Sequence, residues 1–276
     1  MLHTFTHEAM TTTFQVVIAS DDARYARQAA AEAFAELGRI EARLSRFAEA
    51  SDIFRINRLR AGEAAFVHHD TIECLRLAEQ VRRDTAGAFD IAYLGERDQE
   101  PFSLDEASHT VRVLAEGVRL DLGGIGKGFA LDRMGEVLRE WEIASALLAA
   151  STSTLLALDP PPGEEGWAAQ LGPDNAPQRL ALASQALSAS GLAVKGSHII
   201  DPRTGRPAEG RFRAWALAPT AALADALSTA FMAMSDEETL DYCRRNPDIN
   251  AHLLPAPSAA VLSYPPEGME TSAREA

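Results

Sequence analysis

The chain has 276 residues, 46% of them hydrophobic, and its 26 basic and 40 acidic side chains give a formal net charge of −14 at pH 7. That length allows a sizeable buried core, and the excess of acid argues against nucleic acid or anionic membrane as a main partner. Two cysteines, without metal-site spacing, indicate buried thiols. No signal-peptide pattern and no run of about 20 apolar residues occurs. We therefore expect a cytoplasmic protein without a membrane anchor.

Apolar residues recur at helical spacing in six segments. The expected helices cover 21–47, the short segment 51–59 capped by Ser51, 68–84 with Asp70 or Thr71 as cap, the segment after Gly128, the segment opened by Thr220 or Ala221, and 236–246. His68 and His69, at the start of the third helix, are expected to face solvent rather than a metal.

Short runs of alternating or continuous apolar residues indicate strands between these helices. The expected strands cover 14–18, 110–114, 118–122, 146–150, 167–171, 180–183, 186–189, 213–218 and 259–264. Residues 265–276 offer little apolar surface to bury and are expected to be a disordered tail. The domain is therefore expected to cover 1–264.

A glycine-rich turn, residues 123–128 (GGIGKG), joins the expected strand 118–122 to a helix. Such a turn brings unpaired backbone N–H groups and the positive end of a helix dipole close to a ligand, and a phosphate group is the ligand that this arrangement favours. Neither the P-loop nor the dinucleotide fingerprint is present, because Gly128 follows Lys127 and Phe129 replaces the last fingerprint glycine. A turn with only a packing role is the alternative.

A second candidate site lies in the apolar helix that follows Pro219. Asp225 and Thr229 are four residues apart, which places them on one helix face, about 6 Å apart along the axis. A buried carboxylate needs a paired group or a cation. The two oxygen ligands suit Mg²⁺, completed by phosphate and a backbone carbonyl. Alternatively, Asp225 pairs with an arginine and Thr229 bonds to its own helix.

Six segments, in this order, resemble the ApbE family of magnesium-dependent FAD:protein FMN transferases. They are Met10 with residues 12–14 (TTF), 44–58 (LSRFAEASDIFRINR), 87–90 (GAFD), 121–132 (DLGGIGKGFALD), 197–207 (SHIIDPRTGRP) and 218–230 (APTAALADALSTA). The resemblance implies a single α+β domain, T-fold-like, with mixed or antiparallel sheets and an FAD cleft between two-layer units.

The resemblance also assigns residues to FAD and to Mg²⁺. It implies that the flavin cleft is lined by Met10, Phe47, Ala88, Phe89 and Asp90, and that Asp121 and Lys127 contact FAD. It implies that Mg²⁺ is held by the backbone carbonyl of Gly124 and the side chains of Asp225 and Thr229. Asp225 and His198 are the implied catalytic residues. His198 lies near the pyrophosphate as the proton acceptor, and a structural histidine is the alternative.

The implied chemistry is phosphoryl transfer. A threonine hydroxyl of an acceptor protein attacks the FMN phosphorus of FAD, and AMP leaves. The alternatives are a member that binds FAD, or hydrolyses it to FMN and AMP, without an acceptor, and a non-catalytic scaffold. The Ser-Thr-Ser segment favours these alternatives, because residues 149–153 (AASTS) replace the family's N-A-G-G-D. A further departure from the family pattern is Thr11 in place of a glycine. The sequence does not identify the acceptor or the oligomeric state.

Overall fold

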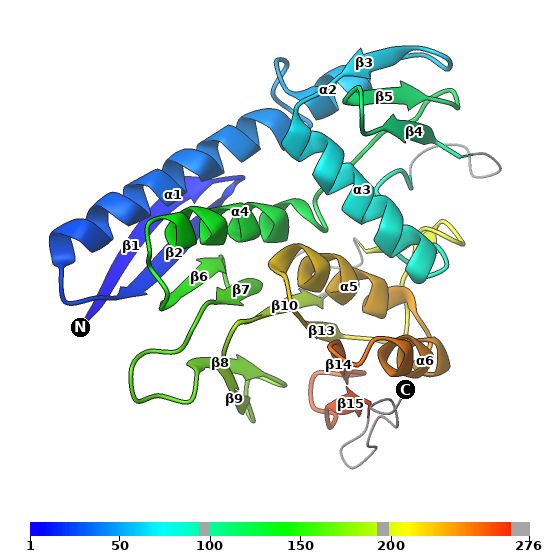
Figure 1. The fold of residues 1–276 in the computed structure, drawn as a ribbon. Helices are drawn as coiled ribbons and strands as arrows, with labels where there is room; N and C mark the ends of the chain where they lie inside the picture. Colours follow the sequence, from blue (N-terminus) through cyan, green and yellow to red (C-terminus); the bar gives the residue numbers. More distant parts are fainter. Residues whose placement is uncertain (94–99, 192–198, 266–276) are drawn as a thin grey trace, which may run out of the picture.

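A large antiparallel sheet runs through the middle of the protein (Figure 1). The computed structural model describes residues 1–93, 100–191 and 199–265. In order across the sheet, the strands are β1 (Leu2–Ala9), β2 (Thr12–Ala19), β6 (Ala146–Ala150), β7 (Thr154–Ala157), β10 (Gln185–Gly191), β13 (Arg213–Ala218), β14 (Asn250–Leu254) and β15 (Leu262–Tyr264). All of their pairings are antiparallel.

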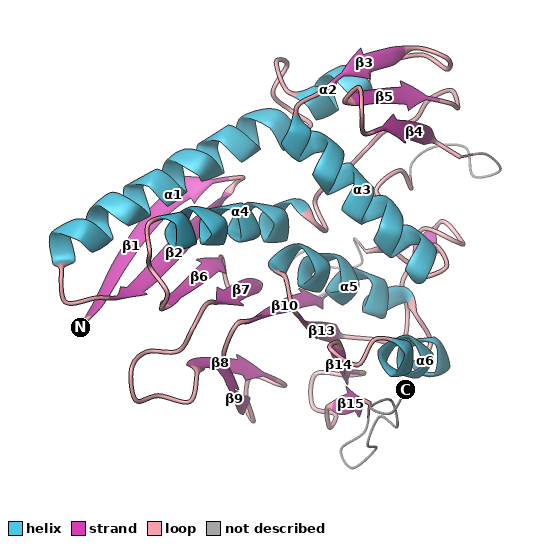
Figure 2. Ribbon diagram, viewed as in Figure 1, coloured by secondary structure: helices cyan, strands magenta, loops and turns pink. Residues whose placement is uncertain are grey.

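Helices pack on one face of this sheet, and a hairpin covers part of the other (Figure 2). The helices are α1 (Ala23–Leu44), α2 (Asp52–Ile56), α3 (His69–Asp84), α4 (Gly126–Glu140), α5 (Ala221–Ala233) and α6 (Asp236–Arg245). The hairpin consists of β8 (Trp167–Leu171) and β9 (Gln178–Leu182). A three-stranded sheet has the order β3 (Ala64–Phe66), β5 (Thr110–Val113) and β4 (Phe102–Asp105). A two-stranded sheet pairs β11 (Ile200–Asp201) with β12 (Arg206–Pro207). The expected α+β class is confirmed.

Strand β13 shows why the sequence builds two cores. Ala214, Ala216 and Ala218 face the helices, while Trp215 and Leu217 join the cluster beneath the β8–β9 hairpin. Successive side chains of a strand point to opposite faces, so both faces of this strand are buried. The small alanines let α5 approach the sheet closely, which brings Asp225 near the neighbouring strands.

The expected strand at 118–122 is wrong, although its alternation of burial is right. Val118, Leu120 and Leu122 are buried, but none of the described strands pairs with them. Instead, the Leu120 N–H donates to Asn57 Oδ1 at 2.6 Å, and the Leu120 carbonyl accepts from Asn57 Nδ2 at 3.0 Å. Because a side chain satisfies the backbone here, the segment stays extended without joining a sheet.

Other observed caps and strand boundaries differ from the predicted ones where tertiary contacts outweigh the local sequence pattern. The cap of α3 is His68, because Asp70 pairs with Arg43 and Thr71 donates to Asp52. Strands β1, β3, β4, β7 and β14 were not expected, and the strand predicted over 259–264 covers only β15. Both cysteines are buried, and both histidines at the start of α3 are exposed, as expected. From residue 266 on, the predicted tail lies outside the described residues.

No helix in the described part of the chain combines the length and apolar character needed to cross a membrane. The longest helix, α1, carries a mixed surface, with a buried stripe that includes Ala30, Leu37 and Ile40. The Asp22 side chain caps it by accepting hydrogen bonds from the Arg24 and Tyr25 N–H groups.

The two-residue turn between β1 and β2 is strained. Met10 has φ 48° and Thr11 has φ 59°, which gives both residues the left-handed backbone of a tight hairpin turn. Threonine is β-branched and disfavours this conformation. The Met10 N–H donates to Glu41 Oε1 at 2.7 Å and thereby ties the turn to the end of α1.

Replacing Thr11 with glycine should raise the free energy of unfolding by about 0.5–1 kcal/mol, because the relief of strain exceeds the added entropy of the unfolded chain. Urea titration of both proteins measures the difference. Thr12→Gly, one residue later in β2, is the matched control and should lower stability instead. A loss of stability in Thr11→Gly would contradict the expected strain.

His252 in β14 gives a predicted pH dependence. Burial lowers the pKa of its imidazole to about 4, and its Nδ1 lies 2.9 Å from the Ser263 hydroxyl. Between pH 6.5 and 4 the unfolded chain binds the proton more readily, so acid favours unfolding by up to about 3 kcal/mol through this group. His252→Gln should therefore lose less stability than the wild type between pH 7.5 and 4.5 in urea titrations. His7→Gln, at an exposed stacked ring, is the control with unchanged pH dependence.

Candidate active site

The N-terminal turns of α4 and α5 touch backbone to backbone above the sheet. A Cβ atom on Gly128 would lie 2.1 Å from the Ala221 carbonyl oxygen, so only glycine permits this approach. The Gly128 N–H donates to Asp225 Oδ2 at 3.2 Å. In return, Asp132 of α4 accepts from the N–H groups of Ala221 and Ala222 at 2.7 and 2.8 Å.

Each helix therefore supplies a carboxylate to the N-terminus of the other. The exchange satisfies N–H groups that a helix leaves unpaired in its first turn, and it places negative charge at the positive ends of two dipoles. Burial raises the pKa of Asp132 to about 6, against the effect of its two N–H donors. The exchange fixes Asp225 of α5 beside the glycine-rich turn.

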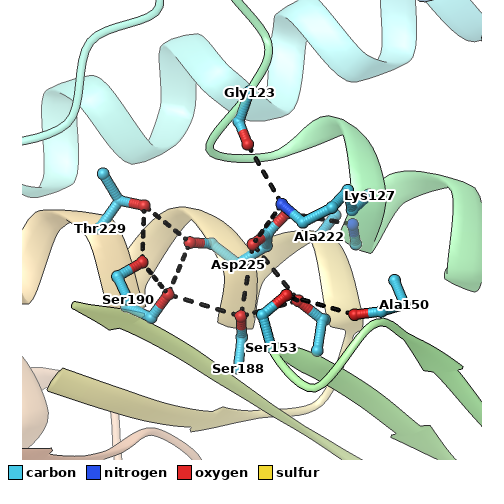
Figure 3. Close-up of polar contacts among 12 residues, drawn as sticks. Gly123, Lys127, Ala150, Ser153, Ser188, Ser190, Ala222, Asp225 and Thr229 are labelled. Carbon is cyan, nitrogen blue, oxygen red and sulfur yellow. Dashed lines mark hydrogen bonds and ion pairs between the residues drawn. The ribbon is translucent and has the colours of Figure 1, made fainter. Parts of the chain in front are cut away.

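Asp225 is only 3% exposed and is paired with a lysine (Figure 3). Lys127 Nζ lies 3.2 Å from Oδ2 and 3.4 Å from Oδ1 of the carboxylate, and 3.2 Å from the Gly123 carbonyl oxygen. The hydroxyl groups of Thr154 and Ser188 donate to Oδ1 at 3.4 and 3.3 Å. The buried charge thus has a partner, but this partner is lysine rather than the arginine of the alternative interpretation.

A row of hydroxyl groups continues from Asp225 along β10 and α5 (Figure 3). Ser190 Oγ lies 2.9 Å from Ser228 Oγ and 3.1 Å from Thr229 Oγ1. The Thr229 hydroxyl donates to the Asp225 backbone carbonyl at 3.3 Å, as the alternative interpretation predicts. The sequence patterns assigned no role to Thr154, Ser188, Ser190 or Ser228. The two-residue spacing of Ser188 and Ser190, which places both on one face of a strand, was the available signal.

The glycine turn meets α5 and the segment 87–90. A Cβ atom on Gly124 would lie 3.2 Å from both Thr229 Oγ1 and Phe89 Cε2. The structure therefore brings Gly124, Asp225 and Thr229 together, and their role as metal ligands stays a prediction.

The turn offers fewer bare N–H groups than its glycine content indicates. Four of its N–H groups donate within the protein: Gly123 to Asp121, Ile125 and Gly126 to Leu122, and Gly128 to Asp225. A phosphate bound here would therefore depend more on cations than on backbone amides.

The residues predicted to contact flavin differ in their partners and in their exposure. Asp121 pairs with Arg46 at 3.0 Å, and the Arg46 guanidinium lies 4.7 Å from the centre of the Phe47 ring, which is 74% exposed. Arg46 was not predicted. Ala88 is buried, and Asp90 accepts from the Ala92 N–H at 2.7 Å.

Two predicted residues are not joined to the Asp225 group. Among the described residues, no hydrogen bond connects Met10 or Phe47 to Asp225 or its partners. His198 lies outside the described residues, directly before Ile199. All flavin-binding and catalytic roles stay predictions.

Ser151 occupies the turn where the family has glycine. Its φ of 55° is in the left-handed region that glycine favours, and its N–H donates to the Thr13 carbonyl at 2.8 Å. The Ser153 hydroxyl donates to the Ala150 carbonyl at 3.2 Å. The turn thus has a glycine-like backbone at Ser151 with serine side chains.

The donor chemistry fits a hard divalent cation. Carboxylate, hydroxyl and carbonyl oxygens are the ligands that Mg²⁺ prefers, often with one or two carboxylates and substrate phosphates. The described residues contain no group of three or more His, Cys, Asp or Glu side chains that could hold a metal. Asp225 would therefore be the single carboxylate, and Lys127 already places a positive charge among these oxygens.

The fold and this centre define an α+β protein in which two helix N-termini meet over a buried carboxylate and a lysine. The model of the ApbE family matches residues 10–253, and the chain belongs to that family. The resemblance found in the sequence is thereby confirmed.

Named relatives support this membership. The FAD:protein FMN transferase of Klebsiella pneumoniae (strain 342) is 26% identical over 59% of this chain and 54% of its own length, and that of Treponema pallidum (strain Nichols) is 30% identical over 52% and 46%. The chain thus spans about half the length of these curated relatives. The apo form of the Pseudomonas stutzeri flavinyl transferase ApbE has a TM-score of 0.82 at 25% identity, covering 95% of this chain and 94% of that one.

Proposed function

We propose that this protein is an FAD:protein FMN transferase that uses Mg²⁺ and acts on a threonine of an acceptor protein. The observation that carries the proposal is the meeting of Asp225, Thr229, Lys127 and the glycine turn at one point. Named relatives carry the same activity in their names. A lysine beside a cluster of oxygen ligands is suited to a substrate with a diphosphate.

The proposed reaction breaks the phosphoanhydride bond between the two phosphates of FAD and forms one phosphoester bond to threonine. The threonine oxygen bonds to the FMN phosphorus as the bond from that phosphorus to the AMP oxygen breaks, and AMP leaves with the electron pair. His198 takes the proton of the threonine hydroxyl. Such a transfer depends mainly on alignment and on neutralised charge.

The chain's own residues supply both requirements. Asp225, Thr229 and the Gly124 carbonyl would hold Mg²⁺, which neutralises diphosphate charge when bound. Lys127 adds a second positive charge from the first turn of α4. The hydrogen bonds from the Ala221 and Ala222 N–H groups to Asp132 hold α4 and α5 together and thereby fix the relative positions of Lys127 and Asp225. Asp121 accepts from the Gly123 N–H of the glycine turn, and its partner Arg46 stacks on the exposed ring of Phe47.

A second candidate function is hydrolysis of FAD to FMN and AMP without an acceptor. The serine-containing turn at 151–153 favours it, because side chains there stand where the family has glycine. The cytoplasmic location expected from the sequence also stays a prediction, and cell fractionation would test it.

One assay separates these functions. The protein is incubated with FAD, Mg²⁺ and a candidate acceptor that contains a threonine, and the products are followed by in-gel flavin fluorescence and by AMP release. Transfer gives a fluorescent acceptor and AMP together. Hydrolysis gives AMP and free FMN only, and a scaffold gives neither product. The absence of a fluorescent acceptor across a panel of candidates, with AMP still released, would contradict the transferase.

A further inference from the structure

Lys127 is held in the manner of a small bound cation. Its ammonium group lies 3.2–3.4 Å from three oxygen atoms: both carboxylate oxygens of Asp225 and the carbonyl oxygen of Gly123 (Figure 3). The lysine side chain is 25% exposed and the Asp225 side chain only 4%. The most buried carboxylate of the site is therefore already neutralised by the chain itself.

The residue type at 127 suits this role. The chain has 26 basic side chains, of which only Lys127 and Lys195 are lysine. At almost every other basic position arginine is used, so the lysine here is not a matter of general composition. An ammonium is a compact charge with three donors, whereas the planar guanidinium of arginine is larger and fits a forked partner. Three convergent oxygens match the ammonium.

Within residues 1–93, 100–191 and 199–265, the other hydrogen-bond partners of Asp225 carry no positive charge. The Gly128 N–H binds Oδ2, and the Thr154 and Ser188 hydroxyls bind Oδ1; all three are neutral donors. A divalent ion bound to the Asp225 carboxylate would compete with the Lys127 ammonium for the same two oxygen atoms. Two cations at one carboxylate repel each other strongly in a buried site.

We propose that Lys127 is the resident cation of the Asp225 site and that a divalent ion binds there by displacing it. This inference rests on the proposed function only in taking Asp225 as the metal ligand. The displaced ammonium stays anchored in the first turn of α4 and becomes free to face a diphosphate. Since the turn uses most of its N–H groups internally, the released lysine supplies the charge that a phosphate needs there.

Calorimetric titration of the FAD-free protein with Mg²⁺ tests the competition. Lys127→Met keeps the length of the stem and removes the charge, and it should bind Mg²⁺ roughly tenfold more tightly or better than the wild type. Arg139→Met is the matched control, because Arg139 is a cation in the last turn of the same helix, about three turns away from Lys127. It should change the affinity less than about twofold, and Asp225→Asn should abolish binding.

A second measurement on the wild type requires no charge change. Acylation of the two lysines is followed by mass spectrometry of their peptides, with Lys195 as the internal reference. Saturating Mg²⁺ should increase the labelling rate of Lys127 relative to Lys195 at least about threefold, because the displaced amine is no longer held by three oxygens. In Asp225→Asn, Lys127 should label rapidly with or without Mg²⁺.

Three results would overturn the proposal. The first is unchanged or slower labelling of Lys127 in wild-type protein that calorimetry shows to be loaded with Mg²⁺. The second is equal Mg²⁺ affinity in wild type and folded Lys127→Met, and the third is no binding to either. Transfer activity is not a readout of these experiments, so the displacement can fail while the transferase stands, or hold in a protein that transfers no FMN.

Discussion

Replacing Asp225 with asparagine should lower the rate of FMN transfer by about three orders of magnitude. The amide has nearly the shape of the carboxylate but no charge. It therefore binds a divalent ion too weakly to offset the hydration energy that the ion loses in the site. It also leaves Lys127 without its counter-ion in a partly buried place. Groups that position and neutralise transferring phosphate contribute losses of this size when removed. The initial rate of flavin fluorescence appearing in the acceptor measures the effect.

The control for this variant is Asp241→Asn, which removes an equal charge from a side chain of α6 that is 64% exposed. Its transfer rate should stay within twofold of the wild type, since a surface carboxylate paired to Arg245 contributes little. Thermal unfolding confirms that both variants are folded before rates are compared. A folded Asp225→Asn protein that retains more than a tenth of the wild-type rate at the same Mg²⁺ concentration would remove Asp225 from the metal site.

Gly128→Ala should destabilise the protein by about 4 kcal/mol. The added Cβ would lie 2.1 Å from the oxygen and 2.5 Å from the carbonyl carbon of Ala221, and 2.7 Å from the Ala222 nitrogen. These are backbone atoms of a helix start, which cannot rotate away as a side chain can. The helices must separate, and both hydrogen bonds to Asp132 are then stretched or lost. Urea titration of the wild type and the variant measures the difference.

Gly126→Ala is the matched control for this prediction, because it adds the same methyl group two residues earlier in α4. Its Cβ would meet only Leu122 Cβ at 3.7 Å, an ordinary contact. The higher helix propensity of alanine should make this variant neutral or up to about 1 kcal/mol more stable. Equal stability of Gly126→Ala and Gly128→Ala would show that α4 and α5 do not touch as described.

The glycine-rich turn and the spacing of Asp225 and Thr229 indicate two parts of the site from local patterns alone, and the six ordered segments of the family resemblance join them into one site. The structure adds groups to which the sequence assigned no role. Thr154 and Ser188 reach Asp225 from two neighbouring strands, and Arg46 links Asp121 to Phe47. Their roles depend on which elements become neighbours, and a single sequence gives no direct signal for that.

Local patterns determined the helices that carry the site. The apolar periodicity and the cap Thr220 predicted α5, and a spacing of four residues placed Asp225 and Thr229 on one face, because helical geometry depends only on residues a few positions apart. The sequence also predicted that a buried Asp225 needs a paired group or a bound cation. Only the tertiary structure decided that this cation is Lys127, 98 residues away, and that residues 118–122 pair with Asn57 instead of a strand. Those outcomes follow from packing between distant segments, whose energies no local pattern contains.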